Sequence, residues 1–265
     1  MRISGNTVLI TGGSSGIGFA LARQLTALGN TVIVTGRHAP ALGLACERLP
    51  AAHAIQSDVS DPHAIAKLYR TVVRDYPQLN VVINNAGVMR KLNLRTFGTD
   101  LNDVTREIDA NLNGTIRMCI QFLPHLMTQL RAALVNVSSG LAFVPTPIAP
   151  VYCASKAAIH SFTQSLRVQL QNTNVAVFEL APPLTQTGLF KGDFNPRDVA
   201  PIEPMNVEVL VRKVIQGMEN DRLKIRPGLS NVLKLMSRVA PGFMLCRLSI
   251  RCSGARQGVG ATIVP

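Results

Sequence analysis

Residues 7–28 read TVLITGGSSGIGFALARQLTAL, and this stretch decides the fold. Thr7–Thr11 is a short apolar run, which is typical of a strand buried on both faces. A turn with four glycines among seven residues follows, and the apolar spacing after it predicts a helix over 16–28. Glycine permits the tight turn, and the start of a helix offers free N–H groups to an anion. We therefore expect the pyrophosphate of a dinucleotide to bind here, at Thr11, Gly12, Ser14, Ser15, Gly16, Ile17 and Gly18.

Short apolar runs alternate with helical patterns along most of the remaining chain. Strands are predicted at Thr7–Thr11, Thr31–Thr35, Ala52–Gln56, Asn80–Asn84, Ala133–Val137 and Val175–Leu180, with a seventh through Leu223–Arg226. Helices are predicted at about 16–28, 40–49, 62–75, 100–129, 151–171 and 206–220. This alternation predicts an α/β fold of the Rossmann type, with a doubly wound parallel sheet built from right-handed βαβ units in a single domain.

We place this domain at residues 1–248. Its segment 182–204 contains five prolines and little periodicity, which predicts a long substrate loop. Residues 249–265 are rich in glycine and poorly patterned, and we expect a basic, disordered tail there.

Composition narrows the class of protein. With 47% hydrophobic and 16% charged residues the chain can bury a large core, which excludes an intrinsically disordered protein. Five cysteines without a CxxC pair argue against a disulfide framework and a zinc site, and we expect no metal. The N-terminal apolar stretch is too short for a signal peptide, and no apolar run reaches the roughly 18 residues of a transmembrane segment. We therefore expect a cytoplasmic protein.

Positive charge is concentrated at the C-terminal end. From Arg222 to Pro265 there are eight basic residues and no acidic one, within a net charge of +12. Such a surface attracts anionic cofactors, lipid headgroups or nucleic acid, although a solvated basic surface is the commoner outcome, and we expect no nucleic-acid partner. Residues 230–248 mix apolar and basic side chains. They either pack on a partner subunit, which we favour, or lie on a membrane surface.

Further landmarks follow the glycine turn in a fixed order along residues 5–225. They are the NNAG motif at 84–87, Asn111 in a helix, Ser139 after the fifth strand, a YxxxK motif at Tyr152 and Lys156, and residues 182–187 after the sixth strand. In this order the sequence resembles the classical short-chain dehydrogenase/reductase family. Residues 136–145 (NVSSGLAFVP) and 235–241 (LMSRVAP) also look like the DltE-like branch of bacterial oxidoreductases.

The resemblance implies an oxidoreductase that moves a hydride between a nicotinamide cofactor and a small carbonyl or alcohol substrate, as a homodimer or homotetramer. It places Asp58 and Val59 at the adenine and Thr187 at the nicotinamide carboxamide. It also places four further residues at the cofactor, namely Asn85, Ala86, Gly87 and Pro182. In one respect the sequence departs from the family, which usually has Pro-Gly where this chain has Pro182-Pro183. Proline removes an N–H and forbids positive φ, so we expect a stiffer loop.

The end of the second strand predicts NADP(H). An NAD enzyme usually has an acid there that bonds the ribose 2′-OH, whereas this chain has Gly36 followed by Arg37. A guanidinium grips a 2′-phosphate with several donors, and His38 with the hydroxyls of Ser14 and Ser15 could assist. The alternative is that Arg37 is an ordinary surface residue.

Tyr152 and Lys156 lie four residues apart on a predicted helix, which puts both on one face. A nearby ammonium favours the phenolate, so we expect Lys156 to lower the pKa of Tyr152 and Tyr152 to act as general acid/base. The resemblance adds that Lys156 bonds the nicotinamide ribose, which makes both residues part of the cofactor site.

Two further residues complete the predicted catalytic set. The Ser139 hydroxyl can bond the substrate oxygen, with Ser138 as the competing choice. The resemblance assigns Asn111 to a proton relay with Lys156, with Asn113 as its competitor.

The substrate side is left open by the sequence. Met89, residues 143–148 and the pair Phe190 and Phe194 suggest an apolar pocket, while three nearby cations could equally favour an acidic substrate: Arg90, Lys91 and Arg95. A non-catalytic dinucleotide-binding regulatory protein is the alternative function, although such a protein does not need the whole catalytic set.

Overall fold

The structure is a computed structural model that describes residues 1–49, 51–96, 98, 100–190, 194 and 203–245. Within these residues seven parallel strands form one sheet, in the order β3-β2-β1-β4-β5-β6-β7. The strands are β1 (Thr7–Thr11), β2 (Thr31–Gly36), β3 (Ala52–Gln56), β4 (Leu79–Asn84), β5 (Ala132–Val137), β6 (Val175–Leu180) and β7 (Lys224–Ile225). The strand order reverses between β1 and β4, and ligands of doubly wound sheets bind at this point.

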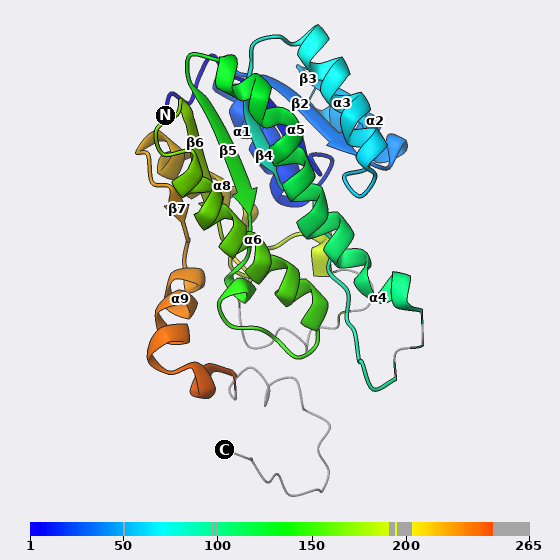
Figure 1. Cartoon of the computed structure of the whole chain (residues 1–265), viewed down its shortest axis with the longest axis vertical. Helices are drawn as coiled ribbons and strands as arrows, with labels where there is room; N and C mark the ends of the chain where they lie inside the picture. The colour runs from blue at the N-terminus through cyan, green and yellow to red at the C-terminus, as the bar shows by residue number, and fades with distance from the viewer. Residues whose placement is uncertain (50, 97, 99, 191–193, 195–202, 246–265) are drawn as a thin grey trace, which may run out of the picture.

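Helices cover both faces of the sheet (Figure 1). They are α1 (Gly16–Ala27), α2 (Ala39–Arg48), α3 (Pro62–Asp75), α4 (Leu101–Glu107), α5 (Gly114–Thr128), α6 (Pro150–Gln169), α8 (Val207–Glu219) and α9 (Leu229–Val239). One apolar core joins α1, α2 and α8 to the sheet, and a second core joins α3, α5 and α6 to its other face. Successive strand residues such as Val8 and Leu9 enter opposite cores, because side chains alternate along a strand. The α/β Rossmann-type prediction with one domain is therefore confirmed.

Local sequence signals explain where several helices begin. The Asp61 carboxylate accepts a bond from the His63 N–H at the start of α3, and Pro62 occupies the first helical position. Asp100 and Asn206 cap α4 and α8 in the same manner. These caps satisfy N–H groups that have no partner within the helix.

The structure differs from the predicted helices in two places. The single helix expected over 100–129 is divided by a π-helical turn at Ile108–Asn113, which separates α4 from α5. A turn of this kind inserts an extra residue into the helix and is frequent at functional sites. The second difference is α9, which was not predicted as a helix, although Leu229 and Leu233 have helical spacing.

Parts of two predicted segments lie outside the described residues. Of the substrate loop 182–204, the structure describes 182–190, 194, 203 and 204, with a short 3-10 turn at Gly188–Phe190. The predicted tail 249–265 lies wholly outside them. None of the helices in the described ranges combines the length and apolar character that a bilayer crossing requires.

Candidate active site

The turn between β1 and α1 forms a cradle of bare backbone. Gly12 and Gly16 have φ values of 64° and 54°, which other residues rarely adopt. A Cβ on Gly12 would lie 2.9 Å from the Cα of Ala86, so this turn lies directly against the NNAG loop. Ser15 precedes α1 without a side-chain cap, and the first turn of α1 has no acid. The free N–H groups and the helix dipole therefore face an open site that suits an anion.

The side chains of Thr11 and Asn85 hold the NNAG loop against this cradle. The buried Thr11 hydroxyl accepts bonds from the Asn85 and Ala86 N–H groups at 3.1 and 3.0 Å. The Asn85 amide donates to the carbonyls of Thr11 and Gly12. Gly18 packs beneath the same turn, because a Cβ there would lie 2.3 Å from the Gly12 oxygen. Thr11 and Gly18 thus shape the cradle from behind.

A cavity of about 650 Å³ extends from the cradle across the carboxyl ends of the central strands. Most predicted cofactor residues line it: Gly12, Ser14, Ser15, Gly16, Ile17, Asn85, Ala86, Gly87, Tyr152, Lys156, Pro182 and Thr187. Thr187 lies opposite the start of α1, because a Cβ on Gly16 would be 3.3 Å from its side chain. The cavity, the bare glycines and the uncapped helix fit an elongated dinucleotide.

Six predicted cofactor residues lie outside this lining: Thr11 and Gly18, which lie behind the cradle, and four residues after β2 and β3, namely Arg37, His38, Asp58 and Val59. Arg37 and His38 follow β2 on the surface, where the Arg37 Nε donates to the His38 Nε2 at 3.2 Å. Asp58 accepts two bonds from Ser60, and Val59 packs against Gly114 at the start of α5. The structure places these last four residues beyond the carboxyl ends of β2 and β3, on the side of the cradle away from Tyr152.

The predicted catalytic side chains meet at the other end of the cavity. Tyr152 and Lys156 come from α6 and both are buried. The Lys156 Nζ donates to the Val137 carbonyl at 2.8 Å and lies 5.7 Å from the centre of the Tyr152 ring. Ser139 lies at the cavity directly after β5 and caps the 3-10 turn Gly140–Ala142. Three hydroxyl or ammonium groups thus converge on one apolar cavity.

The titration of Tyr152 differs from the prediction. Burial raises the pKa of the phenol, and a hydrogen bond with Ser139 opposes this effect without cancelling it. Burial also lowers the pKa of Lys156 to about 8. The effect of burial on the phenol thus outweighs the lowering that we expected from Lys156, whose ammonium donates to the Val137 carbonyl. Tyr152 is a neutral phenol here, which is a proton donor.

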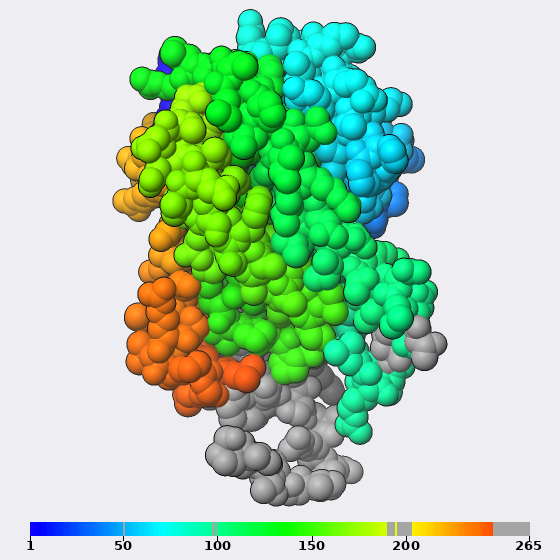
Figure 2. All heavy atoms as spheres, viewed as in Figure 1, coloured from blue at the N-terminus to red at the C-terminus, as the bar shows by residue number. Residues whose placement is uncertain are grey.

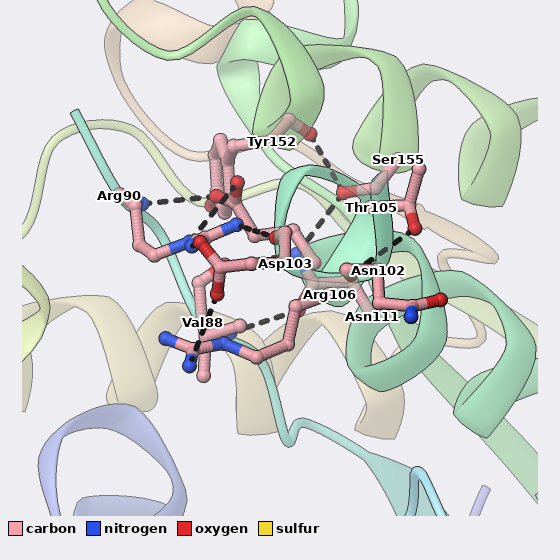
Figure 3. Close-up of polar contacts among 10 residues, drawn as sticks. Val88, Arg90, Asn102, Asp103, Thr105, Arg106, Asn111, Tyr152 and Ser155 are labelled. Atoms are coloured by element: carbon pink, nitrogen blue, oxygen red, sulfur yellow. Dashed lines mark hydrogen bonds and ion pairs between the residues drawn. The ribbon is translucent and has the colours of Figure 1, made fainter. Parts of the chain in front are cut away.

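Asn111 lies in the π-helical turn and is fully buried. Its side chain accepts from the Val88 N–H at 2.8 Å and donates to the Val88 carbonyl and the Ser155 hydroxyl. Ser155 in turn donates to the Tyr152 carbonyl, so a continuous chain of bonds ties Asn111 to the start of α6 (Figure 3). The competing Asn113 bonds Asp109 instead. Of these two asparagines, Asn111 is the one tied to the catalytic helix.

Comparisons with known proteins decide the family. The family model described as short chain dehydrogenase matches residues 6–198. The chain belongs to the short-chain dehydrogenase family. The uncharacterized oxidoreductase DltE of Bacillus subtilis (strain 168) is 47% identical over 189 residues, which cover 71% of this chain and 75% of DltE. The predicted DltE-like branch is thereby confirmed.

Solved structures of other short-chain dehydrogenases share the fold. The enzyme of Burkholderia cenocepacia J2315, in complex with NADP, has a TM-score of 0.80 at 23% identity and covers 94% of this chain and 99% of its own. The enzyme of Burkholderia phymatum, in complex with NAD, has a TM-score of 0.80 at 21% identity and covers 90% and 95%. Since one neighbour holds NADP and the other NAD, these likenesses leave the choice of cofactor open.

The short-chain dehydrogenase fold here contains a buried ion pair that sequence reasoning missed. Glu107 has no exposed surface, accepts the Arg90 N–H at 2.9 Å and pairs with the Arg90 guanidinium at 3.6 Å. Arg90 also bonds Asp103 at 2.8 Å. Burial raises the pKa of Glu107, although Arg90 opposes this effect. The negative charge of Glu107 in turn raises the pKa of Tyr152. Arg90 is thus engaged by acids and does not face the cavity.

A second buried network lies beside the segment that follows β5, which contains Ser138 and Ser139. The Ser138 hydroxyl and the His160 Nδ1 each lie 2.7 Å from the same oxygen of Glu179, a buried residue on β6. Burial alone would raise the Glu179 pKa, but the bonds from His160 and Ser138 outweigh it and lower the pKa. Lys234 from α9 approaches the His160 Nε2 at 3.3 Å. Both serines line the cavity, but the Ser138 hydroxyl is bonded to Glu179, whereas the Ser139 hydroxyl caps the 3-10 turn.

The substrate end of the cavity is apolar. Of the predicted wall, Met89, Thr146 and Ile148 line it, while Phe194 packs beside Tyr152 and the Phe190 side chain lies outside the described residues. The other apolar side chains of this end come from the 3-10 turn Gly140–Ala142, the segment after β6 and the C-terminal part: Leu141, Leu184, Leu189, Leu229, Leu233, Phe243 and Met244. Within the part of the chain that the structure describes, Lys156 is the one charged residue of the lining.

The Pro182-Pro183 departure is accommodated by backbone pairing. The Pro182 carbonyl accepts the Gly140 N–H at 2.9 Å, which joins the loop to the turn after Ser139. Further along, Leu184 and Gln186 exchange backbone bonds with Met205. The described start of this loop is therefore held on both sides.

Proposed function

We propose that the protein is an NADP(H)-dependent oxidoreductase that interconverts a carbonyl and an alcohol, with Tyr152 as the general acid/base. One observation carries the proposal: the phenol of Tyr152, the hydroxyl of Ser139 and the ammonium of Lys156 meet in the cavity that begins at the glycine cradle. Bound NADP(H) would supply or accept the hydride at this site. The protein's own residues then need only to bind the substrate oxygen and to move one proton.

The chemistry of these side chains favours carbonyl reduction. A phenol keeps its proton at neutral pH, and burial of Tyr152 favours this neutral form further, so Tyr152 can give its proton to an oxygen that gains negative charge. The Ser139 hydroxyl can donate to the same oxygen and stabilise that charge. Lys156 is positively charged below pH 8 and adds a favourable field, and Asn111 holds the start of α6 in place. Dry, apolar walls strengthen all of these electrostatic effects.

The preference for NADP(H) is argued from the end of β2. Gly36 stands where an NAD enzyme usually has an acid, so no carboxylate at this position would repel a 2′-phosphate. A Cβ on Gly36 would lie at ordinary contact distances from Ser14 and Leu42, so the backbone does not itself require glycine here. The Arg37 guanidinium is exposed beside His38, where it can turn toward a 2′-phosphate. No acid competes for it at this position, so a 2′-phosphate gains a charge-assisted partner.

A titration of the purified protein with NADPH and NADH tests the cofactor, followed by the dinucleotide's own fluorescence. We expect tighter binding of NADPH, and Arg37→Glu should weaken NADPH by roughly tenfold to a hundredfold while leaving NADH nearly unchanged. Arg70→Glu is the control, because Arg70 is an exposed arginine on α3 and the charge change is the same. Equal affinity for NADH, or equal effects of both variants, would overturn the cofactor assignment.

Turnover of NADPH with a panel of diketones and quinones tests the reaction. We expect Tyr152→Phe to lower kcat by about 10²–10⁴-fold while NADPH binding is retained. Tight NADPH binding without turnover of any carbonyl would instead support a dinucleotide-binding regulatory protein. If neither dinucleotide binds, the oxidoreductase proposal itself fails.

We also propose that the protein is a cytoplasmic homodimer or homotetramer that contacts its copies through α5 and α6. Exposed apolar side chains on and beside these helices support this contact, since Ile120 is 66%, Leu130 93% and Val168 63% exposed. Analytical ultracentrifugation tests it: Ile120→Glu with Val168→Glu should yield monomers, whereas an unchanged sedimentation coefficient would place the contact elsewhere.

A further inference from the structure

The helix α9 has two apolar faces, of which only one faces the protein. On the inner face Leu229 and Leu233 line the cavity. On the outer face Val232, Leu235 and Val239 are 51%, 62% and 72% exposed and form a stripe at helical spacing. Figures 1 and 2 show α9 at the surface, below β7, where the carboxyl ends of the strands lie. The stripe is therefore a solvent-facing apolar surface directly behind the substrate end of the cavity.

Basic residues lie on α9 and on the segment that leads to it. The chain has eight basic residues and no acid from Arg222 to its end, and five of them lie in the described residues: Arg222, Lys224, Arg226, Lys234 and Arg238. They are close enough to influence one another. Burial lowers the pKa of Lys234, and the charges of Arg238 and Arg226 lower it further. Lys234 lies on the inner side of α9, against His160 and the Phe143 ring, so the exposed basic side chains at this end of the molecule are Arg238 on α9 and Arg222 and Lys224 at β7.

This combination of charge and apolar surface selects among three occupants. A second copy is the occupant that the sequence favours for residues 230–248, but a two-fold contact through this surface would place the Arg238 side chains of both copies close together, which is unfavourable. Nucleic acid would neutralise the cations but would offer the aliphatic stripe no apolar partner. An anionic lipid surface satisfies both, because headgroups pair with Lys and Arg while the stripe enters the boundary of the acyl chains.

We propose that the outer face of α9 docks on the surface of an anionic bilayer, and that the cavity behind it takes an apolar carbonyl or alcohol from that bilayer. The second part rests on the proposed function. It is supported by the lining of the cavity, since Leu229, Leu233, Phe243 and Met244 connect the docked segment to the site of Tyr152. Arg90, which could have fixed an acidic substrate, is bonded to Asp103 and Glu107.

Co-sedimentation of the full chain with vesicles tests the docking without any cofactor. We expect binding to vesicles of phosphatidylcholine with about a third phosphatidylglycerol, loss of binding at high salt, and none to phosphatidylcholine alone. Val232→Ser with Leu235→Ser should weaken binding by roughly tenfold or more. Leu44→Ser is the matched control, since Leu44 on α2 is 60% exposed and should leave binding unchanged.

A spectroscopic reporter checks the orientation of the bound protein. The chain contains no tryptophan, so Val239→Trp introduces a single fluorophore on the stripe. Its emission should shift to shorter wavelength on anionic vesicles, whereas a tryptophan at Leu44 should not respond. No binding to anionic vesicles, an unshifted emission, or a change of oligomeric state caused by the stripe variants without any effect on vesicles would overturn the docking.

The substrate part has its own readout. For a series of unbranched aldehydes kcat/KM should rise with chain length, by up to about fourfold for each added methylene, because each methylene that is buried removes apolar surface from water. Equal turnover of short and long aldehydes would overturn the apolar substrate while leaving the proposed function intact. Tyr152→Phe should abolish turnover and still bind vesicles, so the two proposals can fail separately.

Discussion

Replacing Arg90 by methionine tests how the buried ion pair beside Tyr152 is stabilised. Glu107 has no exposed surface, the Arg90 side chain is 15% exposed, and its Nε lies 3.6 Å from the Glu107 Oε2. At an effective dielectric constant of about 20, charges at this distance attract by roughly 4–5 kcal/mol. Methionine keeps the backbone N–H that bonds Glu107 and much of the apolar stem, so the lost charge dominates the effect.

The unpaired carboxyl can limit this loss by taking up a proton. From its ordinary pKa of 4.5 the uptake costs about 1.4 kcal/mol per pH unit, hence roughly 3.4 kcal/mol at pH 7 and roughly 0.7 kcal/mol at pH 5. We therefore expect Arg90→Met to lower the free energy of unfolding by about 3 kcal/mol at pH 7 and about 1 kcal/mol at pH 5. The sign follows because a raised pKa means that the folded state binds the proton more tightly, so stability falls as the pH rises above 4.5.

Unfolding in urea, followed by far-UV circular dichroism at both pH values, measures the change. The corresponding fall in melting temperature at pH 7 is about 6–12 °C. Arg106→Met is the control, because this arginine is 59% exposed and should contribute less than about 1 kcal/mol. Adding Glu107→Gln should remove most of the loss at pH 7. A loss that does not depend on pH, or that Glu107→Gln leaves unchanged, would refute the reasoning.

Three further predictions concern the catalytic turn, the lysine and the cradle. Ser138→Ala removes a 2.7 Å bond to a buried carboxylate and should lower the free energy of unfolding by about 1–3 kcal/mol, whereas Ser139→Ala should lower kcat by about 10²–10³-fold. Urea unfolding and steady-state rates separate the two, and the opposite pattern would exchange their roles. Because the pKa of Lys156 is about 8, its ammonium is lost above that pH, and kcat/KM for carbonyl reduction should fall there; a flat profile between pH 7 and 9 would contradict this. Gly18→Ala would put a Cβ 2.3 Å from the Gly12 oxygen, and should weaken NADPH binding by roughly tenfold in the fluorescence titration; unchanged affinity would show that the cradle does not need this close approach.

The parts of the fold that sequence predicts are those with local signals. Buried parallel strands are continuous apolar runs, so the strand Thr7–Thr11 was predicted with its observed bounds. The glycines that predict the turn are also the residues that allow its positive φ values, at Gly12 and Gly16. Tyr152 and Lys156 share a helix face because of their spacing alone. In each case the residues that carry the signal are neighbours in the chain.

The parts that sequence did not predict depend on partners far along the chain. Glu107 and Glu179 are charged residues, which normally lie on a surface, yet both are buried. Their partners Arg90 and His160 are 17 and 19 residues away along the chain and lie in other elements, so no local sequence pattern predicts the pairing. The sequence does not indicate the π-helical turn either, because its residues continue the helical pattern of their surroundings. A carboxylate one helical turn before Asn111 was the available signal for Glu107.

The charges around Tyr152 bear on the direction of the reaction. Burial and the Glu107 carboxylate both raise the pKa of the phenol, while the Lys156 ammonium is held by the Val137 carbonyl. Oxidation of an alcohol needs the phenolate, which this environment disfavours. Reduction needs the neutral phenol, which is the form that a raised pKa favours. Under the proposed function, the Glu107 carboxylate beside Arg90 therefore favours the neutral form of the phenol, which is the form that carbonyl reduction requires.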